Sequence, residues 1–365
     1  MPTEMELDEN HVITPTPHTQ VNNQLHKKPS SNERVVWLDV LRVIATFGVI
    51  FLHVGGTDYH LPVGEHNWFI VVFFDSLVRW SVPIFVMISG VLFLNPRKEV
   101  SYQVILKKYS ARLLKVYIFW YLAYLILTNL FTTLSHGKFN IELISFKPQF
   151  HLWFLPMLVG VYLLIPILRK VVDNDKLLRY TLIPWLGYIT ISFILIMEVP
   201  QLSNLFSMNW IIGYAGYFLL GYYLSTRDID KKKSIFIYLT GLIGVIITVG
   251  GSVALSFYRG IADEKFLFNI SPHVLMMATA LFVFIKMNST RISTKVICFI
   301  EYIRKDLFGI FLVHGLWLMV FNRVLFRDVC DHSISLPLIA IIIFIFSLYT
   351  TKLLRMISFM RKVIE

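Results

Sequence analysis

Ten apolar segments, each long enough to cross a lipid bilayer as a helix, constrain this chain more than any other feature. The hydrocarbon core of a bilayer is about 30 Å thick, and about 20 residues of α-helix span it. Because lipid offers no hydrogen-bond partners to the backbone, unbroken apolar segments of this length favour helices. The sequence therefore predicts an all-α polytopic membrane protein, a single bundle of about ten transmembrane helices. The segments lie near residues 36–56, 68–94, 116–134, 151–168, 180–198, 205–224, 234–257, 266–286, 308–326 and 336–351.

The basic residues are distributed unevenly between the connections that join these segments. The net charge is +11, and an N-terminus inside the cell places 26 of the 34 Lys and Arg residues on the cytoplasmic side and five outside. This is the bias expected of cytoplasmic loops, so it predicts that both termini are cytoplasmic and argues against nucleic acid as a partner. Residues 1–34 are polar and predict a disordered cytoplasmic tail, and residues 356–365 a second cytoplasmic tail.

The first apolar segment contains ionisable residues that hydrocarbon disfavours. Arg42 and His53 are eleven residues apart, so they lie on the same face of a helix, roughly 16 Å apart along its axis. Intramembrane charges normally face a bundle interior or water, which favours a polar cleft along this face. A structural reading remains open, in which Asp39 and Arg42 pair at i and i+3 and His53 only hydrogen-bonds at the interface.

The second segment raises the same choice at Asp75 and Arg79, which are spaced i and i+4. They either neutralise each other on one helix or serve a reaction.

Several stretches, in order and spacing, resemble the integral-membrane acyltransferase-3 family, whose members O-acylate sugars and polysaccharides with an acyl-CoA. The resemblance covers roughly residues 33–350 and implies that residues 35–355 form the acyltransferase transmembrane domain. One departure is Lys115, where many members carry a second arginine after Arg112. The matching stretches are Arg34, Leu38 and Asp39 followed by Arg42 and His53, "RWSVPIFVMISGVLF" from Arg79, "ARLLKVY" from Ala111, "HLWFLPMLVGVYLLIP" from His151, "GYFLLGYYL" from Gly216 and "FGIFLVHGLW" from Phe308.

Acyl transfer to a hydroxyl needs a base, and His53 is the candidate. The oxyanion needs donors, which Arg79 or the backbone amides of Gly55 and Gly56 could supply. The carboxylate that pairs with His53 is either Asp58, which completes an H-x-x-x-x-D pattern, or Asp75 on the next segment.

The resemblance and the charges also assign binding residues. Arg112 and Lys115 are candidates for the phosphates of acetyl-CoA or another acyl-CoA, with Arg42 steering this donor from the cytoplasmic side. His314 matches a histidine of the family and either lines the thioester passage or only packs. His151 and Trp153 are candidates for binding the acceptor, although an interfacial pair needs no function.

The function expected from the resemblance is that of an O-acyltransferase, most simply an O-acetyltransferase, in a bacterial cell (inner) membrane. Its partners would be acyl-CoA, a glycan or lipid-linked saccharide acceptor, membrane lipid and glycan-assembly proteins. The alternative is a carrier or exporter of a saccharide intermediate, although the sequence shows neither repeats nor broken spans in matching halves. No metal site is expected, since Cys298 and Cys330 lack metal-ligand spacing.

Overall fold

A computed structural model describes residues 36–96, 101–136, 151–198, 210–324 and 331–364, and all its regular secondary structure is helical. This confirms the all-α prediction for the described part of the chain. The predicted tail 1–34 lies outside the described residues. In chain order the helices are α2 (Val36–Gly56), α3 (His66–Val78), α4 (Ser81–Phe93), α5 (Tyr102–Val104), the π-helical turn η1 (Ile105–Ser110), α6 (Ala111–His136), α7 (Phe154–Leu163), α8 (Ile165–Val172), α9 (Asp175–Glu198), α11 (Trp210–Thr226), α12 (Lys231–Arg259), η3 (Lys265–Leu267), α13 (Pro272–Met287), η4 (Ser289–Arg291), α14 (Thr294–Ile303), α15 (Leu307–Val324), α16 (His332–Met356) and α17 (Ser358–Ile364).

Seven helical segments of the described chain are long and apolar enough to cross a membrane, and the pair α7 and α8 makes an eighth if its 56° bend lies within one span. Within the described residues, each predicted segment overlaps a helix. The remaining two coincide with α11, which has 17 residues, and with the shorter apolar part of α15, Leu307–Phe321. The chain is therefore a multi-pass membrane protein, whereas ten spans and cytoplasmic termini remain predictions. The seven segments are Val36–Gly56, His66–Phe93, Tyr102–Leu130, Asp175–Met197, Lys231–Arg259, Lys265–Met287 and His332–Met356.

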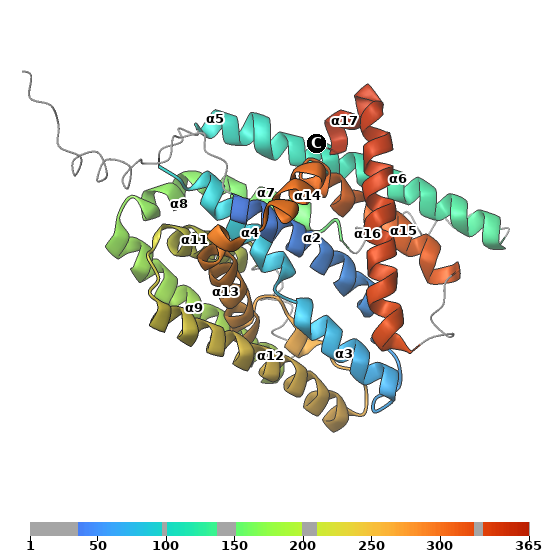
Figure 1. The fold of residues 1–365 in the computed structure, drawn as a ribbon, viewed down its shortest axis with the longest axis horizontal. Coiled ribbons are helices and arrows are strands. Elements are labelled where there is room, and N and C mark those ends of the chain that lie inside the picture. Colours follow the sequence, from blue (N-terminus) through green and yellow to red (C-terminus); the bar gives the residue numbers. More distant parts are fainter. Residues whose placement is uncertain (1–35, 97–100, 137–150, 199–209, 325–330, 365) are drawn as a thin grey trace, which may run out of the picture. The chain divides into compact units, whose positions relative to one another are not determined.

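Helix α2 is the central helix of the bundle (Figure 1). It contacts α3, α4, α13, α14, α15 and α16, and 67% of its apolar window is buried, more than in the other candidate spans. Helices α4 and α11 approach closely because Gly90 and Gly221 lack side chains: a Cβ at either would overlap the partner's backbone. Arg42 and His53 therefore lie on a helix surrounded by protein, as the polar-cleft interpretation requires.

The sequence also places helix boundaries locally. Helix α12 begins after Asp230, whose side chain accepts a hydrogen bond from the Lys233 amide, and ends at Gly260, whose φ of 68° favours glycine. The second predicted span is two helices, α3 and α4, which break at Arg79 and Trp80. The break falls within one continuous apolar stretch, His66–Phe93, so hydropathy alone does not separate the two helices.

One end of the bundle carries cations that hold helix ends together, and we call it the basic end. Arg169 of α8 donates to the carbonyl oxygens of Phe93 (2.8 Å) and Asn95 (3.4 Å) at the end of α4. Lys286 of α13 donates to those of Leu224 (2.7 Å), in the last turn of α11, and Arg227 (2.6 Å), directly after it. Cations at helix C-termini complement the helix dipole, so these two have a structural role.

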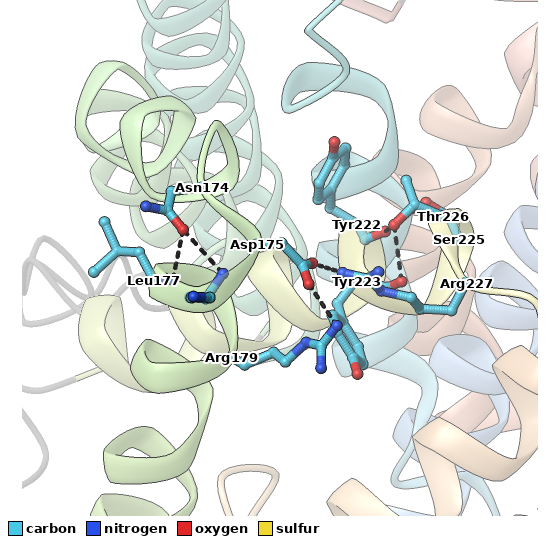
Figure 2. A network of polar contacts seen from close by, with 10 residues as sticks. Asn174, Asp175, Leu177, Arg179, Tyr222, Tyr223, Ser225, Thr226 and Arg227 are labelled. Carbon is cyan, nitrogen blue, oxygen red and sulfur yellow. Dashed lines mark hydrogen bonds and ion pairs between the residues drawn. The ribbon is translucent and has the colours of Figure 1, made fainter.

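Figure 2 shows a second contact at this end, between the start of α9 and the end of α11. Asp175 accepts from Arg179 at 2.5 Å and forms an ion pair with Arg227, whose guanidinium lies 4.8 Å from the ring centroid of Tyr223. Asn174 caps α9 by accepting from the amide of Leu177 at 3.2 Å. This network fixes α9 against α11.

The connections at the opposite end also bind one another. Asp58, in the turn after α2, lies 3.4 Å from His332 at the start of α16, measured between Oδ2 and Nε2. The hydroxyl of Tyr59 donates to the carbonyl oxygen of Asp263 at 2.8 Å. Burial raises the pKa of the Tyr59 phenol above its ordinary value, so the hydroxyl keeps its proton.

Candidate active site

A cavity of about 610 Å³ opens at the basic end among α2, α4, α6, α7, α15 and α16. Its volume falls within the range of roughly 300–1,000 Å³ typical of small-molecule sites. Its lining combines cations with an apolar wall that includes Phe85, Phe154, Phe308 and Phe311. The cations are Arg42, Arg112, Arg304, Lys305 and Arg355.

The charge of the cavity is strongly positive, because no acidic side chain is among the described residues that line it. Asp39 does pair with Arg42 (2.8 Å), and Asp306 pairs with Arg355 (2.6 Å). The predicted Asp39–Arg42 pair therefore exists, but it leaves Arg42 lining the cavity. Two carboxylates do not balance five cations, so the site is suited to an anion with several charges.

Of the two residues predicted to bind the phosphates of the donor, only one lines the cavity. Arg112 lines the cavity, with its guanidinium carbon 6.0 Å from the ring centroid of Phe308. Lys115, one helical turn further along α6, is exposed and is not among the lining residues.

Three further cations of the lining, Arg304, Lys305 and Arg355, were not predicted as site residues, because in the sequence they count only as charges that set the topology. A signal was present for the first two, since "RKDLFGIFLVH" places them directly before the helix that carries His314.

Three histidines, which we call the histidine cluster, meet beyond the cavity. His53 of α2 and His314 of α15 stack with ring centroids 5.4 Å apart, and His151, in the turn before α7, lies 4.7 Å from His314 and 6.4 Å from His53. These residues were predicted to have three different roles: His53 as the base, His314 in the passage for the donor thioester and His151 in binding the acceptor. The structure brings the three together. Among the described residues, no group of three His, Cys, Asp or Glu side chains is arranged to hold a metal ion.

Helix α15 fixes the cluster through its backbone. His314 Nδ1 lies 2.6 Å from the carbonyl oxygen of Phe311 and donates to it, so the neutral ring carries its lone pair on Nε2. Tyr124 donates to the carbonyl oxygen of Leu312 at 2.7 Å. A Cβ at Gly315 would lie 2.6 Å from His151 Cε1, so this glycine allows His151 to approach the helix.

Phenylalanine rings separate the cavity from the histidine cluster. Phe311 lines the cavity, and its ring centroid also lies 5.8 Å from that of His151 and 5.9 Å from that of His314. Phe85 and Phe154 pack against it at 6.5 Å and 5.7 Å, and against each other at 6.0 Å. None of the three histidines is among the described residues that line the cavity. Phe311 therefore lies between the cavity and two of these histidines, His151 and His314.

The two candidate carboxylates bind other partners. Asp75, fully buried, forms an ion pair with Arg79 and accepts from its Nε at 3.2 Å. Asp58 binds His332 at the far end of the bundle. Arg79 lies at the break between α3 and α4. The pair predicted at i and i+4 is thus formed.

Trp153 lies two residues after His151 and contacts other aromatic rings. Its ring centroid is 5.1 Å from that of Trp210 and 6.0 Å from that of Tyr214. Trp210 is 38% exposed, so this aromatic group borders the surface of the described bundle.

A comparison with protein families found one match: a family model described as an acyltransferase domain covers residues 35–355. No curated protein matches the chain, and no solved structure does.

Proposed function

The chain belongs to the acyltransferase-3 family and is a membrane acyltransferase, and from this premise we propose that it moves an acyl group, most simply acetyl, from acyl-CoA to a hydroxyl of a glycan or lipid-linked saccharide. The observation that carries the proposal is the cation-lined cavity, whose wall residue Phe311 also contacts two members of the histidine cluster.

Coenzyme A suits this cavity because one end of it carries several phosphate charges and the other a thioester on a thin pantetheine arm. Arginine binds phosphate through two parallel hydrogen bonds, and Arg42, Arg112, Arg304 and Arg355 supply four guanidinium groups. The arm would then run along the apolar wall toward the histidine cluster. Arg42 and His53 are eleven positions apart on one helix, which corresponds to roughly 16 Å along its axis. This distance is comparable with the reach of an extended pantetheine arm.

His53 would act as the general base. It takes the proton of the acceptor hydroxyl while the oxygen attacks the thioester carbon, and the intermediate collapses by breaking the carbon–sulfur bond. The proton finally returns to the thiolate, so the products are an O-acyl ester and CoA thiol. The ring of His314 stacks on that of His53.

Arg79 would stabilise the oxyanion that forms during this attack. A cation aimed at developing charge in a water-poor site is among the most effective catalytic devices. Asp75 would act as a positioning residue, because its ion pair holds the guanidinium of Arg79 in place. The backbone amides of Gly55 and Gly56 remain the other candidate donors.

The acceptor would bind near His151 and Trp153, with Trp210 extending the aromatic surface. The imbalance of basic residues favours a basic end in the cytoplasm, where acyl-CoA is made. The acceptor would then react within or beyond the membrane, and glycan-assembly proteins would be neighbours in a bacterial inner membrane.

Membrane vesicles from cells that express the protein provide the test. The vesicles are incubated with acetyl-CoA labelled in the acetyl group, and label is measured in the saccharide and glycolipid fractions. We expect incorporation with the native chain and none with a folded His53→Ala variant. If the native chain and the His53→Ala variant export saccharide equally well and neither incorporates label, the carrier function is correct and the transferase function is wrong.

A further inference from the structure

We propose that Phe311, packed between Phe85 and Phe154, limits the length of the acyl group that this protein can transfer. The inference rests on the proposed function and deepens it, since it concerns the donor rather than the existence of transfer.

The position of Phe311 makes it the residue that the acyl group must meet. Its ring lines the cavity on one side and contacts the rings of His151 and His314 on the other. Since the thioester carbon has to reach His53 for attack, the acyl group itself must extend past this ring. The residues packed around Phe311 therefore limit the space available to an acyl chain.

The ring of Phe311 is held on several sides. Phe85, Phe154, His151 and His314 all lie within 6.5 Å, measured between ring centroids. The carbonyl oxygen of the same residue accepts from His314 Nδ1. Protein interiors are packed about as densely as organic crystals, so the ring cannot turn aside without moving the residues that perform the chemistry.

The region beyond Phe311 is already filled. Tyr124 is fully buried, and His151 and His314 are each 1% exposed. The ring of Tyr124 lies 5.1 Å from that of His151, and a Cβ at Gly315 would overlap both side chains. An acetyl methyl is the smallest group to place there, whereas each further methylene must displace a packed side chain. A pocket of this kind discriminates by about tenfold or more for one methylene.

Phe308 provides a matched control on the same helix. It also lines the cavity, but it lies one turn nearer the basic end, beside the guanidinium of Arg112. Removing this ring would widen the cavity where the donor is held and leave the space beside the histidines unchanged.

The experiment measures competition of acetyl-CoA, butyryl-CoA and hexanoyl-CoA against labelled acetyl-CoA on purified protein in nanodiscs, which needs no acceptor. We expect the native chain to bind acetyl-CoA at least about tenfold more tightly than hexanoyl-CoA. Phe311→Ala should abolish this preference, and Phe308→Ala should weaken all three donors by a similar factor. Phe311→Leu keeps an apolar side chain in the core and should reduce the preference, so it serves if the alanine variant does not fold.

Transfer rates in vesicles with the same three donors should show the same order. An unchanged ratio of acetyl to hexanoyl binding in folded Phe311→Ala and Phe311→Leu would overturn the inference, as would equal binding of both donors by the native chain. If the native chain binds none of the three, the proposed donor site is wrong and the inference falls with it. Binding with an unaltered chain-length preference overturns only the inference.

Discussion

The cavity and the histidine cluster share helices α2 and α15 but differ in charge and in exposure. Helix α2 contributes Arg42 to the cavity and His53 to the cluster, and α15 contributes Phe308 and His314 in the same order. The cavity is open and lined by five cations, whereas His151 and His314 are buried. Under the proposed function, the two shared helices would bind the charged donor at one end and perform the chemistry further in, so binding and transfer should respond to different substitutions.

The largest effect is expected at His53. His53→Ala removes the base and should lower the transfer rate by about 10²–10⁴-fold, the usual contribution of general base catalysis. The dissociation constant for acetyl-CoA should change less than about twofold, because a base acts in the transition state. Labelled acetyl transfer and equilibrium binding measure the two quantities. If His53→Ala weakened acetyl-CoA binding as strongly as it lowered the transfer rate, the cavity and the histidine cluster would be a single site.

A smaller loss of rate is expected at Asp75. Asp75→Asn removes the ion pair that holds Arg79, and the transfer rate should fall about ten- to hundredfold with little change in KM for the donor. Asp75→Glu should recover part of the rate. Because breaking a buried pair destabilises a protein by about 3–5 kcal/mol, the thermal midpoint has to be measured beside the rate.

Asp58→Asn is the control for this substitution. Asp58 binds His332 at the opposite end of the bundle, so its removal should leave the transfer rate near normal. A normal rate in Asp75→Asn and a large loss in Asp58→Asn would instead assign Asp58 as the partner of His53.

Substitutions in the cavity should change the affinity for the donor rather than the transfer rate. Arg112→Ala should raise the dissociation constant for acetyl-CoA by about ten- to a hundredfold, as expected for losing a charge-assisted phosphate bond, with the rate at saturation unchanged. Lys115→Ala should have little effect, since Lys115 does not line the cavity. Arg42→Ala should also weaken binding, and Arg42→Lys should restore it only partly, because lysine lacks the planar fork. Equal effects of Arg112→Ala and Lys115→Ala would move the donor site out of this cavity.

The sequence predicted the helices and several members of both regions, for identifiable reasons. The spacing of Arg42 and His53 fixes their common face, because an α-helix turns by the same angle at every residue. Arg304, Lys305 and Arg355 were missed because a basic residue that sets topology and one that lines a cavity look alike in sequence. Arg169 and Lys286, which cap helix ends, belong to the same basic excess.

His151 was predicted to meet the acceptor, and its contact with His314 depends on Gly315 and on the fold of three helices. Long-range contacts of this kind have no periodic signal in the chain. The break at Arg79 was missed because it falls within one continuous apolar stretch, His66–Phe93.

The smallest effect is expected for a basic residue that caps a helix end outside the cavity lining. Arg169→Met removes the donor to the carbonyl oxygens of Phe93 and Asn95 and should lower the free energy of unfolding by about 1 kcal/mol. The dissociation constant for acetyl-CoA should stay within about twofold of the native value. A tenfold loss of donor affinity in Arg169→Met would mean that the helix-capping cations and the cations of the cavity do not have separate roles.

The most direct measurement places a thiol in the cavity and asks whether acyl-CoA covers it. Ser89 lines the cavity, and Ser89→Cys in a chain with Cys298→Ser and Cys330→Ser gives one reactive site. Its reaction with a membrane-impermeant thiol reagent is followed in inside-out vesicles, with and without acetyl-CoA at a concentration that saturates transfer. We predict that acetyl-CoA slows labelling at least about tenfold and that adding Arg112→Ala removes this protection at the same concentration. An unchanged labelling rate at saturating acetyl-CoA would contradict the assignment of the cation-lined cavity as the donor site.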